Sequence, residues 1–288
     1  MNYLQIAKKY RAKKSLGQNF LIDEAILDCI IDHADISDNE TIIEIGSGLG
    51  FLTQKIARKA QKVIAIEIDP FAVDYLNSLN LKNVYPVEKD ILQLQFSELV
   101  SEPAKVLANI PYYITTPILT HLLGEIDLPD HQNRQYLKEL IIMVQKEVAR
   151  RIIATDQSKN KEYGLLSILI SFHATIEHII DVPPSAFYPR PSVDSSVLKI
   201  TPRQKPAVTP VDTSIFKKVI KASFTYRRKN LKNALINGGF SSNIVKEAMK
   251  QSGINEIIRG ETLSMTDFVA LSDKIYELQR GYPADANN

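Results

Sequence analysis

The stretch 109–113, Asn-Ile-Pro-Tyr-Tyr, carries side chains that could hold a flat ring bearing an amine. Such an amine is a poor nucleophile because its lone pair is conjugated into the ring. If the Asn109 oxygen and the Ile110 carbonyl accept its two N–H groups, the nitrogen can become tetrahedral. Pro111 fixes the backbone and Tyr112 can stack on the ring. We interpret the stretch as a nucleobase site; the alternative is a helix-start turn with a core tyrosine.

A glycine-rich turn, Glu44 to Gly50, is a second candidate for ligand binding. A dinucleotide site needs Gly-x-Gly-x-x-Gly, but here Phe51 takes the third glycine's place. Glu44 would also repel a pyrophosphate. Glycines beside an acid fit a cationic cofactor without phosphates, and S-adenosylmethionine is such a cofactor. A tight turn without a ligand is the alternative.

Two further acids stand at the ends of predicted strands. Glu67 follows the first glycine by about twenty residues, the distance at which a carboxylate meets ribose hydroxyls. Asp90 ends the next strand, where its carboxylate can receive the adenine amine. Their recurrence at successive strand ends favours one shared nucleoside site.

The elements that position these residues alternate between apolar strands and amphipathic helices. This order predicts an α/β fold with a parallel, doubly wound sheet, which binds ligands at the carboxyl ends of its strands. The apolar run 165–180 has no clear internal boundary, and the proline-rich 183–191 predicts an irregular loop. The expected strands are 41–45, 62–67, 84–87, 105–108, 139–145 and 195–200, and the expected helices are 24–34, 51–60, 71–80, 117–124 and 146–155.

The rest of the chain has a helical period throughout. Residues 202–210 look like a linker, and glycines mark breaks between the segments that follow. We therefore expect two domains, 1–202 with the doubly wound sheet and 203–288 as a small all-helical domain. The expected helices are 212–225, 229–237, 242–252 and 266–279.

Charge and cysteine content narrow the class of protein. Lys and Arg total 35 against 33 Asp and Glu, but residues 1–22 hold five basic residues and no acid, and 203–232 hold nine against Asp212 alone. Such blocks can bind a polyanion or simply be solvated surface. Cys29 is the only cysteine, so no intrachain disulfide is possible. With no apolar run of membrane-spanning length and no cluster of metal-binding residues, we expect a cytoplasmic protein without membrane or metal.

Five blocks, taken in order, resemble the rRNA adenine N6-dimethyltransferases, and most closely the KsgA family. That family transfers methyl groups from S-adenosylmethionine to two adjacent adenosines near the 3′ end of small-subunit (16S) rRNA. The resemblance runs from Lys13 to about Leu235 and implies a Rossmann-like methyltransferase domain followed by a small helical domain. The blocks are 14–21 (KSLGQNFL), 44–50 (EIGSGLG), 67–69 (EID), 109–112 (NIPY) and 187–195 (FYPRPSVDS).

The resemblance also assigns roles that the residues alone leave open. Asn19 and Leu21 otherwise suggest loop packing, and Phe187 suggests packing or stacking equally well. Tyr113 stands where these families often carry Asn. The implied cofactor contacts are Asn19, Leu21, Gly46, Glu67, Asp90 and Asn109, and the implied contacts of the target adenine are Asn109, Tyr112 and Phe187.

The basic blocks gain a meaning from this resemblance. The segment 223–235 looks like the family's basic segment, and the arm from Lys8 to Lys14 is placed to cover the site's entrance. The implied partner is small-subunit rRNA in a pre-30S particle, bound by a monomer through Arg227, Arg228, Lys229 and Lys232. Three alternatives stay open: an Erm-type methyltransferase of large-subunit rRNA, a ribosome assembly factor, and a nicotinamide-dependent oxidoreductase.

Overall fold

The computed structural model describes residues 2–128, 131–158 and 162–281. Contacts within the chain define two compact units. The first comprises Met1–Gly124, Asp130–Arg150 and Thr175–Pro202, and the second comprises Glu125–Pro129, Arg151–Ala174 and Arg203–Asn288. The predicted division into domains at residue 202 stays a prediction.

A seven-stranded sheet has the strand order β4-β3-β2-β5-β6-β9-β7. Neighbours from β4 to β6 run parallel, whereas β9 is antiparallel to β6. The sheet is therefore mixed, although strand–helix alternation predicts a parallel one. β7 precedes β9 in the chain and is its other neighbour in the sheet, and the connection between these two strands contains no α-helix. Only parallel neighbours need a long crossover, so β9 is free to run opposite to the strands beside it. The strands are β2 Thr41–Ile45, β3 Lys62–Glu67, β4 Val84–Glu88, β5 Ala104–Asn109, β6 Leu137–Gln145, β7 Ala174–Val182 and β9 Ser195–Pro202.

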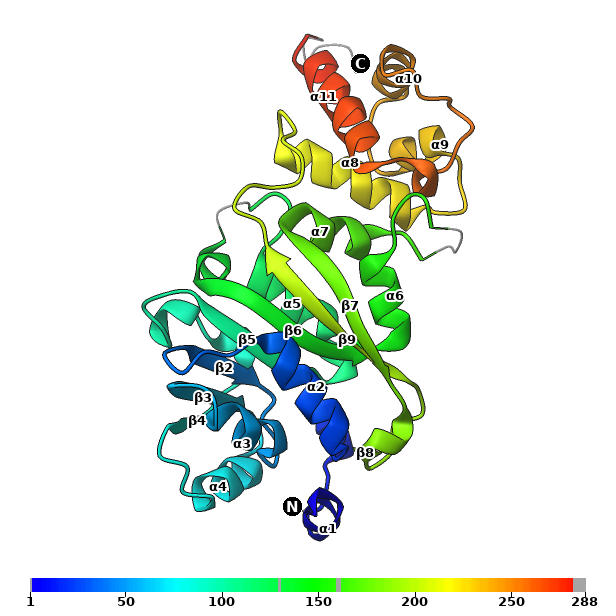
Figure 1. Ribbon diagram of the computed structural model, residues 1–288. Helices are drawn as coiled ribbons and strands as arrows, with labels where there is room; N and C mark the ends of the chain where they lie inside the picture. The colour runs from blue at the N-terminus through cyan, green and yellow to red at the C-terminus, as the bar shows by residue number, and fades with distance from the viewer. Residues whose placement is uncertain (1, 129–130, 159–161, 282–288) are drawn as a thin grey trace. The chain divides into compact units, whose positions relative to one another are not determined.

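Helices cover both faces of the sheet in the first unit. In Figure 1, helix α2 lies in front of the sheet and helix α5 behind it. The central strands are buried on both faces, as in β2, where four successive residues from Ile42 are buried. The helices are α1 Tyr3–Lys9, α2 Glu24–Ala34, α3 Phe51–Ala57, α4 Pro70–Ser78, α5 Thr115–Leu123 and α6 Lys146–Ile153, of which the residues up to Arg150 belong to the first unit.

Helix α2 shows why the sequence predicted its bounds correctly. Asp23 accepts hydrogen bonds from the backbone N–H groups of Ala25 and Ile26 at 3.0 and 3.2 Å. These N–H groups have no partner inside the helix, so the Asp23 carboxylate fixes where it begins. Leu27, Ile30 and Ile31 then form its buried side.

The topological switch point lies between β2 and β5. From β2 the chain builds β3 and β4 on one side, and it then returns to place β5 on the other side. The turn after β2 and the end of β5 therefore face the same crevice, at the carboxyl ends of both strands. Gly46 and Asn109 are the residues that the sequence places there.

A second, two-stranded sheet pairs β1, Phe20–Leu21, with β8, Phe187–Tyr188. The backbone N–H of Ile22 also donates to the Ala186 carbonyl at 2.8 Å. The proline-rich loop thus contains a short strand that the sequence did not predict. This pairing joins the N-terminal arm to a segment more than 160 residues later in the chain.

The second unit is mainly helical. Helix α8 packs against α9 and α11, and α10 packs against α9 and α11. The apolar run 165–180 divides into helix α7 and the start of β7 at residue 174. No described helix of the chain is long and apolar enough to cross a bilayer. The helices are α7 Leu165–His173, α8 Thr213–Thr225, α9 Leu231–Asn237, α10 Ser242–Gln251 and α11 Met265–Gly281.

Candidate active site

A cavity of about 220 Å³ opens at the switch point of the first unit. Its walls are the arm segment 16–20, the turn after β2, the ends of β3 and β5, the loop after β4, and the short 3₁₀-helix Tyr112–Ile114. The cavity brings together six residues singled out from the sequence: Asn19, Gly46, Glu67, Asp90, Asn109 and Tyr112.

The glycine turn lets β2 and β5 approach each other closely. Gly46 has a φ of 74°, which residues with a side chain rarely adopt. A Cβ atom added there would lie 3.2 Å from the Asn109 carbonyl oxygen. The glycine therefore keeps the floor of the cavity open beside Asn109.

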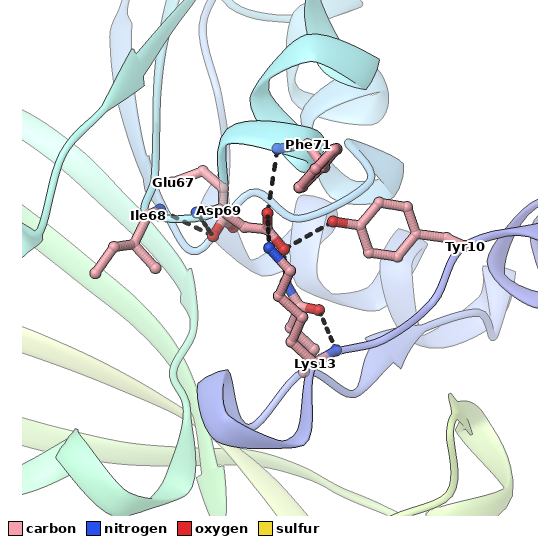
Figure 2. Close-up of polar contacts among 7 residues, drawn as sticks. Tyr10, Lys13, Glu67, Ile68, Asp69 and Phe71 are labelled. Carbon is pink, nitrogen blue, oxygen red and sulfur yellow. Dashed lines mark hydrogen bonds and ion pairs between the residues drawn. The ribbon is translucent and has the colours of Figure 1, made fainter.

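Glu67 ends β3 with its carboxylate fixed by three backbone N–H groups. Gly48 donates to Oε2 at 2.8 Å, and Ile68 and Asp69 donate to Oε1 at 2.9 and 3.0 Å, as Figure 2 shows for the last two. Burial raises the pKa of Glu67 more than these bonds lower it. Because Oε2 accepts only one bond, it can accept another from a ligand hydroxyl.

Asp90 lies at the end of the loop after β4. Its Oδ1 accepts a bond from the Leu92 backbone N–H at 3.0 Å, which caps the 3₁₀-helix Ile91–Gln93. The residue is half-buried and lines the cavity. One carboxylate oxygen therefore positions the side chain, and the other can face a donor in the cavity.

Asn109 ends β5, and its amide has a defined orientation. Its Nδ2 donates to the Asn19 carbonyl at 3.1 Å, and the Asn19 side chain in turn donates to the Gly17 carbonyl at 3.1 Å. Within the described part of the chain, no hydrogen bond is made to Asn109 Oδ1. That oxygen is therefore available to accept an N–H group.

The Tyr112 ring lines the same cavity as Asn109 and is fixed at its far end. Its hydroxyl lies 2.6 Å from Ser195 Oγ on β9. Burial raises the pKa of Tyr112, and the Ser195 bond offsets part of that rise. The neighbouring Tyr113 is 61% exposed and packs over Gly17, whose added Cβ would lie 3.2 Å from its ring.

Leu21 and Phe187 do not line this cavity. Both are buried and face each other across the β1–β8 pair. Phe187 is only 1% exposed and belongs to the core. Leu21 lines a second cavity of about 40 Å³, next to Glu44 and Ser47.

Glu44 is a buried acid whose Oε2 has no hydrogen-bond partner within the described residues, and the same holds for Ser47 Oγ. Burial raises the pKa of Glu44 to about 8, and the nearby Glu67 charge adds to the rise. Unpaired polar atoms are costly in a core. Acceptors at the glycine turn, together with Glu67 and Asp90, fit the donor groups of S-adenosylmethionine: its ammonium, its ribose hydroxyls and its adenine amine.

The basic segment of the second unit is partly engaged in ion pairs. Arg227 Nε lies 2.7 Å from Glu261, and Lys232 Nζ lies 2.5 Å from Glu256. Arg228 and Lys229 are exposed in the turn between α8 and α9, and neither forms an ion pair with another described residue.

The sequence assigned no role to three residues around the site, Tyr10, Gln18 and Asp69, although Gln18 and Asp69 stand in the blocks 14–21 and 67–69. The only local signal was Asp69 before Pro70, a pair typical of a helix start. Asp69 does accept a bond from the Phe71 backbone N–H at 3.1 Å, and the structure adds distant partners for it. No group of His, Cys, Asp or Glu suited to a metal ion occurs within residues 2–128, 131–158 and 162–281.

A sheet that is parallel from β4 to β6, a cavity at its switch point and acids at successive strand ends define a Rossmann-like methyltransferase that uses S-adenosylmethionine. Comparison with known proteins identifies the group within this class. The family described as "Ribosomal RNA adenine dimethylase" matches residues 9–277. The chain belongs to this family.

Individual relatives agree with this assignment. "Ribosomal RNA small subunit methyltransferase A" of Bacillus licheniformis is 42% identical over 95% of both chains. The protein of the same name from Clostridium botulinum is 41% identical over 96% of this chain and 100% of its own. A dimethyladenosine transferase structure from Plasmodium falciparum has a TM-score of 0.68 at 25% identity and covers 90% of this chain and 96% of that chain.

Proposed function

We propose that this protein transfers methyl groups from S-adenosylmethionine to the N6 atoms of two adjacent adenosines near the 3′ end of small-subunit (16S) rRNA. The products are N6-dimethyladenosines, formed during 30S subunit biogenesis. The observation that carries this proposal is the orientation of Asn109, whose Nδ2 is used by Asn19 and whose Oδ1 is left for an amine. Relatives named for the small subunit support the choice of rRNA.

The cofactor occupies the part of the cavity between the arm and β3. Glu67 Oε2, which accepts only the Gly48 N–H within the protein, accepts charge-assisted hydrogen bonds from the ribose hydroxyls. Asp90 receives the adenine amine. Asn19 and Gly46 border the cavity, and Leu21, which lines the smaller cavity together with Gly46, is a further cofactor contact in this proposal. When bound, S-adenosylmethionine supplies a methyl group on a positively charged sulfur.

The target adenine enters beside Asn109. Asn109 Oδ1 and the Ile110 carbonyl accept the two N–H groups of N6, which frees the nitrogen lone pair for the methyl carbon. Tyr112, tethered by Ser195, stacks on the ring. Phe187 supplies a second aromatic face only if its ring becomes accessible, because it is 1% exposed. As the nitrogen bonds to the methyl carbon, the carbon–sulfur bond breaks and S-adenosylhomocysteine leaves as a neutral thioether. The methylated nitrogen then passes its proton to water, so the step needs no strong general base.

Residues 203–288 form the RNA-binding domain in this proposal. Structured RNA is held mainly through its phosphates, and the target base must leave the stack to reach the pocket. Arg227, Arg228, Lys229 and Lys232 contact the phosphates, and the basic arm from Lys8 to Lys14 covers the entrance. The protein acts as a monomer on a pre-30S particle in the cytoplasm.

Ligand stabilisation tests the cofactor assignment. A ligand that binds only the folded protein stabilises it by RT ln(1 + [L]/Kd). At a concentration about 100 times Kd, S-adenosylhomocysteine should add roughly 2.7 kcal/mol to the free energy of unfolding, and NAD should add nothing. Stabilisation by NAD, with none by S-adenosylhomocysteine, contradicts the proposal. Glu67→Ala is the matched variant and should lose the stabilisation.

A further inference from the structure

Asp69 is a completely buried carboxylate that gathers donors from a distant part of the chain. It follows Glu67 by two residues and begins helix α4. Figure 2 shows Tyr10, Lys13 and the Phe71 backbone N–H converging on it. Its four donors are Tyr10 Oη at 2.7 Å, Lys13 Nζ at 2.9 Å, Gln18 Nε2 at 2.7 Å and the Phe71 N–H at 3.1 Å.

Three of these donors come from the N-terminal arm, more than fifty residues earlier in the sequence. Burial raises the pKa of Asp69, but the bonds from Lys13, Tyr10 and Gln18 outweigh it, so the net pKa is lowered. Burial and the nearby Asp69 raise the pKa of Tyr10, which keeps its hydroxyl a donor. A buried charge is tolerated only when paired and hydrogen-bonded, and here every bond secures the arm or the helix.

The arm that Asp69 secures is one wall of the cavity. Gln18 uses both ends of its amide: Nε2 donates to Asp69, and Oε1 accepts from the Lys13 backbone N–H at 2.7 Å. Gln18 is therefore fixed, and so is the next residue, Asn19. The Asn19 carbonyl is the group that orients the amide of Asn109.

Asp69 also touches the opposite wall. Its backbone N–H donates to Glu67 Oε1 at 3.0 Å. One residue is thus bonded to the acid at the end of β3 and, through Gln18 and Asn19, linked to the amide at the end of β5. Neither link is needed merely to begin helix α4, for which the Phe71 bond suffices.

We infer that Asp69 is a positioning residue for methyl transfer, which holds the arm against β3 so that Glu67 and Asn109 keep their orientations together. This inference rests on the proposed function for its catalytic readout. Asp69 contacts neither substrate nor cofactor in this role. It acts through Gln18 and Asn19 on one side and through the Glu67 carboxylate on the other.

If Asp69 only stabilised the fold, removing a comparable ion-pair network away from the site would lower activity equally. Glu40 provides this control. Glu40 is another carboxylate in the first unit bonded to lysines, namely Lys105 at 3.0 Å and Lys138 at 2.5 Å. It precedes β2, at the amino ends of the strands, and does not line the cavity. Glu40→Gln therefore removes a comparable ion-pair network away from the site.

The test compares Asp69→Asn, Gln18→Ala and Glu40→Gln with the wild type. Calorimetry measures the affinity for S-adenosylhomocysteine, and methylation of 30S particles that lack the modification gives kcat at saturating cofactor. Asp69→Asn should lower both the affinity and kcat at least about tenfold. Gln18→Ala should lower kcat more than the affinity for S-adenosylhomocysteine, because Gln18 holds Asn19, whose carbonyl orients the Asn109 amide. Glu40→Gln should leave both values within about twofold of wild type.

Hydrogen exchange supplies a readout that needs no RNA. Asp69→Asn should accelerate exchange of backbone amides across residues 13–20, and Glu40→Gln should not. If Asp69→Asn fails to fold, Gln18→Ala and Tyr10→Phe carry the same test with one donor removed each.

The inference is overturned if Asp69→Asn, Gln18→Ala and Tyr10→Phe leave kcat, affinity and hydrogen exchange unchanged. It is also overturned if Glu40→Gln lowers kcat and affinity as much as Asp69→Asn does. A wild type that binds S-adenosylhomocysteine but methylates no adenosine overturns the proposed function instead. In that case the affinity and exchange measurements still decide the role of Asp69.

Discussion

Single residues at the site take their orientation from partners far away in the sequence. The Asn109 amide is oriented by a carbonyl 90 residues earlier, and the Tyr112 hydroxyl by a serine 83 residues later. The types and spacing of residues 109–112 predict a base site, and the structure places Asn109 and Tyr112 in one cavity. They could not reveal these partners, because a backbone carbonyl or a lone serine has no sequence pattern of its own.

Glu44 gives a prediction for pH dependence at this scale. Its pKa rises from the ordinary value of 4.5 to about 8 in the folded protein, chiefly through burial. The folded state therefore keeps a proton that the unfolded state loses above pH 4.5. Stability must fall as pH rises from about 4.5 to about 8, by on the order of 1 kcal/mol per pH unit for this group.

Glu44→Gln should remove this dependence, because an amide does not titrate. Denaturant unfolding without cofactor should show the variant gaining stability relative to wild type from pH 5 to pH 8. Glu40→Gln is the control: burial raises the pKa of Glu40, but bonds from Lys138, Ser37 and Lys105 lower it to about 2, so its effect should be constant over this range. If the difference in free energy of unfolding between Glu44→Gln and wild type is also constant from pH 5 to pH 8, Glu44 is already ionised at pH 5.

At the scale of elements, the site depends on how the 3₁₀-helix Tyr112–Ile114 is joined to β9. The hydroxyl-to-hydroxyl contact between Tyr112 and Ser195 is the side-chain bond that ties the Tyr112 ring to the sheet. A partly buried bond of this kind contributes about 0.5 to 1.5 kcal/mol. Its loss should loosen the ring without removing its stacking surface.

A double-mutant cycle tests this tether. Tyr112→Phe and Ser195→Ala should each lower kcat roughly threefold to tenfold, and the double variant should lose little more than either single one. Tyr112→Ala should lose far more, since the ring itself is gone. Additive effects in the double variant would mean that the two hydroxyls act separately.

Local signals predicted most helices and strands, whereas pairing between distant segments was not predictable. Asp23 fixed the start of α2, and the apolar stretch 62–67 gave β3 with its correct bounds. The β1–β8 pair has only two residues in each strand, too few for any period. The prediction of a parallel sheet was wrong for β9, because the direction of this strand depends on a loop path that leaves no sequence pattern.

At the scale of the whole molecule, the proposal requires the basic turn between α8 and α9 to bind RNA. Arg228 and Lys229 are its exposed cations, whereas Arg227 and Lys232 are paired with acids. Replacing Arg228 and Lys229 with Ala should weaken rRNA binding. It should also reduce the slope of log affinity against log salt by roughly 0.7 to 0.9 for each phosphate that the variant no longer neutralises.

A control variant removes the same number of positive charges from another surface of the second unit. Lys246 and Lys250 are exposed on α10, and replacing both with Ala should leave the salt slope nearly unchanged. Filter binding across a range of salt concentrations measures both slopes. Equal slopes for wild type and the Arg228/Lys229 variant would remove this turn from the interface.

Mass mapping of rRNA measures whether this protein methylates two adjacent adenosines in the small-subunit RNA. Small- and large-subunit particles without the modification are incubated with the protein and S-adenosylmethionine, in parallel with Asn109→Ala. We expect dimethyladenosine at two neighbouring positions near the 3′ end of the small-subunit RNA, and a loss on the order of 100-fold or more with the variant. Methylation of large-subunit RNA instead, or wild-type turnover by Asn109→Ala, would contradict the proposed function.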